Sequence, residues 1–315
     1  MSENSPWYPI SDYFKQRFGG KIYKVSVSVA ESCPNRQQRQ GESSDQPHSG
    51  CIFCDEWGSA AYHLQQDLPL TEQIRYNREI IAKRYHAERF LIYFQAYTNT
   101  FARVEQLRQR FTTALASEGV VGVVLGTRPD CLPQRIMPLL QEISETRYLM
   151  VELGVQSFND SQLQFLQRGH NSATTLHAIE RLQHDCPEID MGIHLIFGLP
   201  NETDDEIIAT AKRLNALPVH NVKLHNLHVL RGTPLAEIYQ RGEFVPLELE
   251  AYRDRVILFL RHLRPDIAVQ RVCAVASRWD ELIAPAWTKE KMRPTQEIKS
   301  SMTSLGVVQG DCWRG

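Results

Sequence analysis

The sequence predicts an α/β fold built around a parallel sheet, and three observations lead to this prediction. Strand-like runs alternate with amphipathic helical stretches along most of the chain, as in proteins made of repeated βαβ units. The predicted strands carry aliphatic residues on one face and polar or small residues on the other. At 315 residues with 42% hydrophobic content, the chain is long enough to bury a large core in one α/β barrel or in two smaller domains.

Six strands and the helices between them account for this order. The expected strands cover residues 21–29, 89–97, 120–128, 147–156, 191–199 and 221–230. Helices are expected at residues 71–85, 161–169 and 203–214, among others. Thr203 and Glu206 have the spacing of a capping box, and Gly169 is a C-cap candidate for the middle helix. Right-handed crossovers allow either an open sheet or an incomplete barrel, so the pattern leaves both open.

The alternation of strands and helices changes after residue 235. A long helical stretch at residues 247–263 is followed by the segment "IAVQRVCAVA" at 267–276 and by an irregular tail rich in Trp, Lys and Arg. We therefore expect three segments, which are a lead-in at residues 1–19, a core at residues 20–235 and a C-terminal extension at residues 236–315 that packs on the core.

The polar faces of the strands indicate a ligand. Period-two alternation assigns Lys24, Glu152, Gln156 and His194 to these faces. A sheet that is buried equally on both sides has continuously aliphatic strands, and these strands do not. The sequence therefore predicts helices on the aliphatic face and a ligand chamber on the polar face.

Charge and hydropathy restrict the function classes. The formal net charge is −2, so the chain as a whole does not favour a polyanion, and any nucleic-acid contact has to be local. The first twenty residues contain no continuous apolar region of a signal peptide, and no later run approaches the roughly 18 apolar residues that span a bilayer. These observations predict a cytoplasmic protein without membrane contact. Clustered thiols in that reducing compartment indicate metal or redox chemistry.

Three of the seven cysteines lie close together after the first expected strand. Cys51 and Cys54 are separated by two residues, and Cys33 precedes them. Such a set can bind zinc, in which case His48 or His63 is a candidate fourth ligand. It can also hold an iron–sulfur cluster that leaves one iron without a protein ligand. The first alternative describes a zinc-stabilised binding module, and the second describes an enzyme with an open coordination position.

Several segments carry a family resemblance. They are "SCPNR", "GCIFC", "YFQAYTNTF", "GTRPDCLP", "ELGVQSFND", "RGHN", "HLIFGLPNET", "VKLHNLHVLRGTPLA" and "LIAPAW", in this order along the chain. With them, the chain resembles radical S-adenosylmethionine (SAM) proteins of the bacterial YhcC-type family. This family is related to the Elongator catalytic subunit and to oxygen-independent coproporphyrinogen dehydrogenase. The resemblance implies a partial (β/α)6 TIM-type barrel with a C-terminal extension of helices and strands.

The resemblance also implies the cofactors. Cys33, Cys51 and Cys54 would hold a [4Fe-4S] cluster, and SAM would bind the fourth iron through its amino and carboxylate groups. Such an enzyme cleaves SAM reductively to a 5′-deoxyadenosyl radical, and its electron comes from a reductant such as flavodoxin or ferredoxin. SAM would then occupy the coordination position that a fourth thiolate would otherwise fill.

Further positions match SAM contacts of these relatives. Phe53 corresponds to an apolar residue beside the adenine, and Glu152 and Gln156 correspond to residues that bind the ribose and methionyl parts. Arg168 is a candidate partner of a carboxylate, with a surface arginine at a helix C-terminus as the alternative.

The end of the second strand departs from the pattern of many radical SAM proteins. These proteins carry a Gly-Gly-Glu signature there, which holds the SAM amine, and the signature is absent here. We expect Gln95 and Asn99, in the segment "QAYTN", to supply the missing hydrogen bonds.

Candidates for catalysis are Cys131, His194 and His225. Cys131 is either a hydrogen-atom donor or a small buried residue. The two histidines either bind substrate and move protons, or are hydrogen-bonded core residues. Cys186, Cys273 and Cys312 are interpreted as structural.

The substrate is the least defined part of the prediction. Because the Elongator relative modifies a wobble uridine in tRNA, a tRNA nucleoside is our hypothesis, with a small metabolite or a peptide as the rival. Basic residues of the tail, Lys289, Lys291 and Arg293, are candidates for local contacts with tRNA phosphates.

Overall fold

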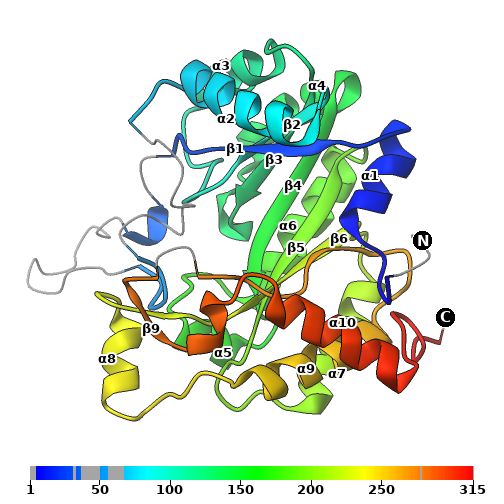
Figure 1. Ribbon diagram of the computed structural model, residues 1–315. Coiled ribbons are helices and arrows are strands. Elements are labelled where there is room, and N and C mark those ends of the chain that lie inside the picture. Colours follow the sequence, from blue (N-terminus) through cyan, green and yellow to red (C-terminus); the bar gives the residue numbers. More distant parts are fainter. Residues whose placement is uncertain (1–4, 31–32, 37–49, 56–66, 277–278, 315) are drawn as a thin grey trace, which may run out of the picture.

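A parallel sheet forms the centre of the protein (Figure 1). The computed structural model describes residues 5–30, 33–36, 50–55, 67–276 and 279–314. Within these ranges, seven parallel strands follow the order β1-β2-β3-β4-β5-β6-β8. They are β1 (Tyr23–Val27), β2 (Phe90–Phe94), β3 (Val120–Thr127), β4 (Tyr148–Gln156), β5 (Asp190–Phe197), β6 (Asn221–Asn226) and β8 (Ala268–Arg271). Since β1 and β8 are the two edges of this sheet, the barrel is open, and the predicted partial barrel is confirmed.

Helices connect the strands along the chain. The longer ones are α2 (Leu70–Tyr85), α3 (Val104–Leu115), α4 (Met137–Thr146), α6 (Ser172–Asp185), α7 (Asp204–Asn215), α9 (Leu249–His262) and α10 (Arg293–Leu305). The shorter ones are α1 (Ile10–Phe18), α5 (Asp160–Phe165) and α8 (Pro234–Gln240). Single turns of 3₁₀ helix are η1 (Pro34–Arg36), η2 (Pro129–Cys131), η3 (Gln134–Ile136) and η4 (Ala286–Lys289).

Local sequence signals explain several boundaries. The predicted capping box of α7 is present, because the Thr203 hydroxyl accepts from the Glu206 amide and the Glu206 carboxylate accepts from the Thr203 amide. Gly169 does not cap α5, because this helix already ends at Phe165 and its C-cap is Leu166. Gly169 instead has a φ of +74° in the following turn, where a Cβ would lie 2.3 Å from Asn35 Oδ1.

The C-terminal part of the chain also contributes to the sheet. Its run at 268–271 is the seventh strand, β8, which pairs in parallel with β6. The predicted strand at residues 221–230 is divided, because β6 ends at Asn226 and β7 (Val229–Leu230) pairs antiparallel with β9 (Leu282–Ala284). The segment boundaries expected after residues 19 and 235 stay predictions.

The two faces of the sheet have different surroundings. Val25, Ile92, Val151 and Ile193 represent the aliphatic face, which lies in the main hydrophobic core. On the opposite face, α1 covers one end of the sheet by packing Phe14 in a separate cluster with Leu91, Tyr93, Val124 and Met150. Beyond this cluster, the same face carries Glu152, His194 and Lys223 beside Gly154 and Ile196. The predicted polar side is therefore observed on this part of the face, and not beneath α1.

Residues from the two ends of the chain meet beside β8. The Val269 amide donates to the Tyr8 carbonyl (2.7 Å), and the Tyr8 amide donates to Gln309 Oε1 (2.9 Å). Gln309 Nε2 donates to the carbonyls of Arg264 and Ile267, both at 2.8 Å. Figure 1 shows the marked N and C ends on the same side of the molecule.

None of the helices in the described ranges combines the length and the apolar character that a membrane crossing requires.

Candidate cofactor and substrate chamber

Two adjoining cavities lie on the polar face of the sheet, near the carboxyl ends of the strands. The first has a volume of about 230 Å³ and is lined by Cys33, Cys51 and Cys54 among others. The second, of about 340 Å³, reaches β7. We call the two cavities together the chamber. Their shared lining residues are Phe53, Gln95, Gln156, His194, Lys223, His225 and Arg271. Ligand sites of barrels built from parallel strands lie at this end of the strands.

The cysteine turn is tied to the rest of the chamber by backbone hydrogen bonds. The Cys54 amide donates to the Cys51 carbonyl (3.0 Å), so residues 51–54 form a tight turn. Ile52 lies at its tip, donating to the Leu166 carbonyl and accepting from the Leu235 amide. Phe53 is thereby held on the wall of the chamber. His48 and His63, the candidate zinc ligands, lie outside the described residues.

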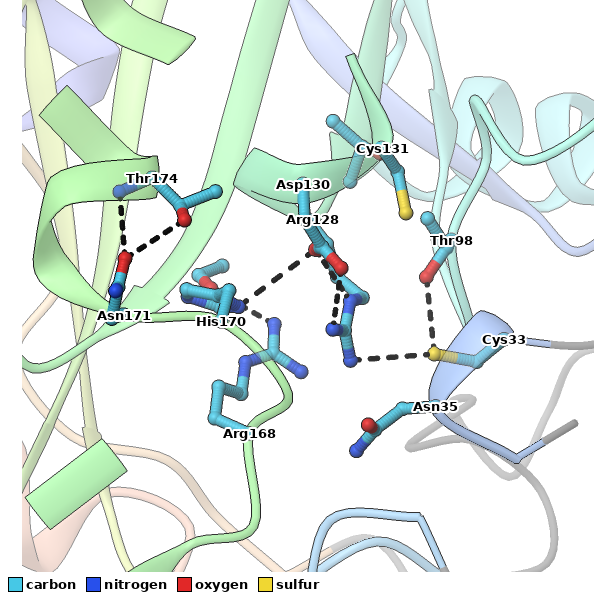
Figure 2. A network of polar contacts seen from close by, with 12 residues as sticks. Cys33, Asn35, Thr98, Arg128, Asp130, Cys131, Arg168, His170, Asn171 and Thr174 are labelled. Carbon is cyan, nitrogen blue, oxygen red and sulfur yellow. Dashed lines mark hydrogen bonds and ion pairs between the residues drawn. The ribbon is translucent and has the colours of Figure 1, made fainter. Parts of the chain in front are cut away.

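Hydrogen-bond donors surround two of the cysteine sulfurs. Thr98 Oγ1 and Arg128 Nη1 approach Cys33 Sγ at 3.3 and 3.8 Å (Figure 2). Asn35 Nδ2 and Arg168 Nη1 approach Cys51 Sγ at 3.4 and 3.3 Å. Arg128 and Arg168 thus place charged hydrogen-bond donors at two of the three sulfurs, as is common around iron–sulfur sites.

Two kinds of metal site require different arrangements of these ligands. Across the described residues, no three Cys, His, Asp or Glu side chains are grouped as ligands of one metal ion. A [4Fe-4S] cluster does not need such a group, because each cysteine binds a different iron. Three cysteines on one cavity, with cationic donors on two of their sulfurs, fit this cluster.

Arg128 is a site residue that the sequence interpretation missed. It is 2% exposed, and its Nε and Nη2 donate to the two carboxylate oxygens of Asp130, each at 2.8 Å. Although burial opposes the shift, these bonds and the Arg128 charge hold the pKa of Asp130 below its usual range. The pair fixes the guanidinium so that its Nη1 points to Cys33 (Figure 2). The only signal for it in the sequence is an Arg and an Asp two residues apart in "GTRPDCLP".

Glu152 occupies the centre of a buried charge cluster. Its side chain is fully buried, with Oε1 2.6 Å from Lys24 Nζ and Oε2 2.6 Å from His194 Nε2 and 3.3 Å from Lys223 Nζ. Burial alone would raise the pKa of this carboxyl, but the charges of Lys223 and Lys24 hold it well below its usual range. Both oxygens of Glu152, expected to contact SAM, are therefore engaged by protein side chains.

The same cluster determines the protonation of its neighbours. Burial and then the charge of Lys223 lower the pKa of His194 to about 4, so the imidazole is neutral near pH 7. Burial lowers the pKa of Lys223 to about 8, against the opposing effect of Glu152. Lys223 Nζ also donates to Tyr93 Oη at 2.8 Å.

The structure brings most of the other expected site residues to the chamber. Gln95, Gln156, His194 and His225 line both cavities, and Arg168 lines the first. Gln156 has a φ of +71°, which turns the chain sharply at the end of β4.

Asn99 and Cys131 are not among the chamber-lining residues. Asn99 Nδ2 donates to the carbonyls of Phe94, Ala96 and Gly126 at 3.0 to 3.1 Å. It thus stabilises the turn after β2, where Ala96 and Tyr97 have positive φ values. Cys131 is buried in η2, and burial raises the pKa of its thiol to about 12.

Comparisons with known proteins agree with this geometry. The Radical SAM superfamily model matches residues 44–214, and the Radical_SAM C-terminal domain model matches residues 219–304. The first match includes Cys51 and Cys54 and begins after Cys33.

Individual relatives and one solved structure are also similar to this chain. Protein YhcC of Escherichia coli (strain K12) is 34% identical over 297 residues, which cover 93% of this chain and 91% of that protein. A tRNA uridine(34) acetyltransferase of Methanocaldococcus infernus is 29% identical over 153 residues, or 48% of this chain and 28% of that protein. The solved structure of archaeal Elp3 from Methanocaldococcus infernus, with an N-terminal deletion, has a TM-score of 0.70 at 17% identity; the match covers 91% of this chain and 64% of that one.

The YhcC match extends over nearly the whole of both chains, and the Elp3 structure shares the fold. The chain therefore belongs to the radical SAM superfamily of enzymes, and within it to the YhcC-type family that its motifs indicated.

Proposed function

We propose that this enzyme holds a [4Fe-4S] cluster on Cys33, Cys51 and Cys54, binds SAM beside it and acts on a nucleoside of tRNA. The observation that carries the cofactor part is the position of the three cysteines on one cavity, with Arg128 and Arg168 at two of their sulfurs. When bound, the cluster and SAM supply reductive cleavage of SAM to a 5′-deoxyadenosyl radical, with an electron from a reductant such as flavodoxin or ferredoxin.

Residues of the chamber have separate tasks in this proposal. Phe53 provides an apolar wall for the adenine, and the amides of Gln95 and Gln156 hold polar groups of SAM. Arg168 binds sulfur and orients the cysteine turn. Glu152 holds Lys24 and Lys223 in place. Helix α1 closes one end of the sheet, which helps to exclude water and competing hydrogen donors from the radical chemistry.

The tRNA part of the proposal has its own support. The similarity to a tRNA uridine(34) acetyltransferase covers 48% of the chain. Lys289 and Lys291 are exposed beside the start of α10. Arg293 is also exposed, although Glu290 (2.9 Å) and Glu297 (3.7 Å) partly balance its charge. Such a cationic surface can contact phosphates locally while the net charge stays negative.

Two measurements test the tRNA substrate. A comparison of tRNA nucleosides between a strain with the gene and a deletion strain should reveal one altered nucleoside. Binding of tRNA by the holoprotein should weaken with salt. Replacement of Lys289, Lys291 and Arg293 by Gln should reduce the slope of log K against log salt by roughly 0.9 for each phosphate that these side chains neutralise.

A matched triple variant controls for net charge. Replacement of the exposed cations Arg135, Arg147 and Lys212 by Gln removes the same charge elsewhere and should leave the slope nearly unchanged. Unaltered nucleosides in the deletion strain, together with salt-independent binding, would exclude tRNA and favour a small metabolite or a peptide.

The zinc-stabilised module is not favoured by any observation on the described residues or by the relatives. Metal analysis separates the two functions directly. We expect about four iron and four sulfide per chain after anaerobic purification, whereas stoichiometric zinc without iron would contradict the proposal.

A further inference from the structure

A row of paired residues crosses the polar face of the sheet. The strand register pairs Gly154 with His194, His194 with Lys223, and Lys223 with Arg271. Paired residues on neighbouring parallel strands project to the same face of a sheet. Lys223 and Arg271 accordingly both line the two cavities of the chamber. Two cations at neighbouring positions repel each other, most strongly where water is scarce.

The carboxylates near this pair do not balance it. Glu152 is shared between Lys24 and Lys223. Arg271 donates through Nε to the Leu224 carbonyl at 3.3 Å, and within the described ranges it forms no ion pair with an acidic side chain. Lys24 lines neither cavity, but it shares Glu152 with Lys223. The two carboxylates Glu152 and Asp55, the latter on the second cavity, therefore face the three cations Lys24, Lys223 and Arg271.

The chamber histidines do not change the sign of the net charge beside Lys223 and Arg271. Burial lowers the pKa of His228 to about 4 and that of His225 well below its usual range, with the charge of Arg271 as the next cause. Burial also lowers the pKa of Arg271 itself. A buried cation without an anionic partner is costly, so its environment favours a ligand that brings the missing negative charge.

Lys223 and Arg271 retain unused hydrogen-bond donors. An ammonium group has three N–H donors and a guanidinium has five. Among the described residues, Lys223 Nζ contacts Tyr93 Oη and Glu152 Oε2, and Arg271 uses Nε. The free N–H groups of both side chains are therefore sufficient to hold a carboxylate or a phosphate.

Lys223 and Arg271 also line the second cavity, whose other walls differ from those of the first, cysteine-lined cavity. The second cavity is lined by Ile196, Leu227, Leu230, Ala274 and Val275, and by no cysteine. We propose that Lys223 and Arg271 bind a carboxylate or phosphate group of the substrate, whose apolar or aromatic part packs on this wall. That this ligand is the substrate rests on the proposed function, whereas the anion site itself rests on the charges and the cavity.

Anion binding tests the proposal without knowledge of the substrate. Inorganic phosphate and, separately, acetate are titrated by calorimetry into the anaerobic holoprotein saturated with SAM, at low ionic strength. We expect binding by the parent and an affinity at least about tenfold lower in Arg271→Gln and in Lys223→Gln, since each removes a charged hydrogen bond. Lys83→Gln removes an exposed cation of α2 and should bind like the parent. If Arg271→Gln does not fold, Lys223→Gln tests the same site.

The outcomes separate the sources of the anion. If the SAM affinity of both variants falls as much as their phosphate affinity, the pair serves the SAM carboxylate, and the substrate site is excluded. No phosphate or acetate binding by the parent, or equal loss in Lys83→Gln, also overturns the proposal. SAM cleavage by the parent with dithionite is measured in parallel. Its absence contradicts the proposed function, whereas the phosphate titration still decides the anion site.

Discussion

Arg168 bridges Cys51 and strand β4: its Nη1 lies 3.3 Å from Cys51 Sγ, and its Nη2 donates to the Gly154 carbonyl at 2.8 Å. A cation and a hydrogen bond at a ligating sulfur stabilise the more negative, reduced form of an iron–sulfur cluster. We therefore predict that Arg168→Gln lowers the midpoint potential of the cluster by on the order of 50 mV, or about 1 kcal/mol for one electron. Redox titration followed by electron paramagnetic resonance measures this shift.

Arg135→Gln is the matched control for this prediction. Arg135 is exposed in η3 and has no role at the cysteines. Its replacement should leave the potential unchanged. A potential of Arg168→Gln equal to that of the parent, at full iron content, would show that the contact with Cys51 does not affect the cluster.

Gly154→Ala tests the same contact without removing the charge. A Cβ at Gly154 would lie 2.5 Å from Arg168 Nη2 and 3.0 Å from Gln156 Nε2, so the guanidinium has to move away. We expect a shift of the midpoint potential with the same sign as in Arg168→Gln. Gly126→Ala is the control from the neighbouring strand, since its nearest atom, the Phe94 carbonyl oxygen, is at 3.2 Å. Equal shifts in both glycine variants would argue against displacement of Arg168 as the cause.

The cysteine assignment makes a prediction for each thiolate. In the proposed site each cysteine would bind a separate iron, so Cys33→Ala, Cys51→Ala and Cys54→Ala should each lose the cluster. Cys33 is the most informative of the three, since it lies before the matched superfamily segment. Cys186→Ala should retain iron and sulfide, because Cys186 is buried at the end of α6 with its Sγ 3.5 Å from the Met137 carbonyl. Iron and sulfide are measured after anaerobic reconstitution, and full content in Cys33→Ala would exclude Cys33 as a ligand.

The low pKa of His228 predicts that the protein becomes less stable in acid. Its folded-state pKa of about 4 lies below the usual value of 6.5, so the unfolded state binds more protons between these two pH values. The free energy of unfolding therefore falls as the pH decreases from 6.5 to 4, by up to about 3 kcal/mol for one such histidine. His228→Gln should flatten the pH dependence in this window. Urea unfolding at several pH values tests this, with exposed His177→Gln as the control; parallel curves for His228→Gln and the parent would contradict it.

The alternation of the sequence predicted the sheet well, because each strand has to present an aliphatic face to the helices. It did not identify 268–271 as a strand of the same sheet. That assignment depends on pairing with β6, whose residues Asn221, Val222 and Lys223 lie far earlier in the chain. A four-residue run has too little alternation to reveal such a partner.

The spacing of the three cysteines predicted that they act together, and the structure brings them to one cavity. Their role as cluster ligands stays a prediction. Asn99 was expected at SAM. Its Nδ2 donates to three carbonyls of the turn after β2, where Ala96 and Tyr97 have positive φ values, and the SAM contact stays a prediction. The position of Arg128 beside Cys33 and that of Arg271 in the chamber depend on distant segments, which a local pattern does not reveal.

The meeting of Tyr8, Val269 and Gln309 has a consequence for biosynthesis. The ribosome synthesises the chain from the N-terminus, so residues 6–9 emerge long before their partners in β8 and Gln309 are made. Until then, one edge of the nascent sheet keeps unpaired amide and carbonyl groups, which can pair with other chains. We expect fragments that end before residue 268 to aggregate during synthesis, because the strand and the contacts that complete this edge arrive last.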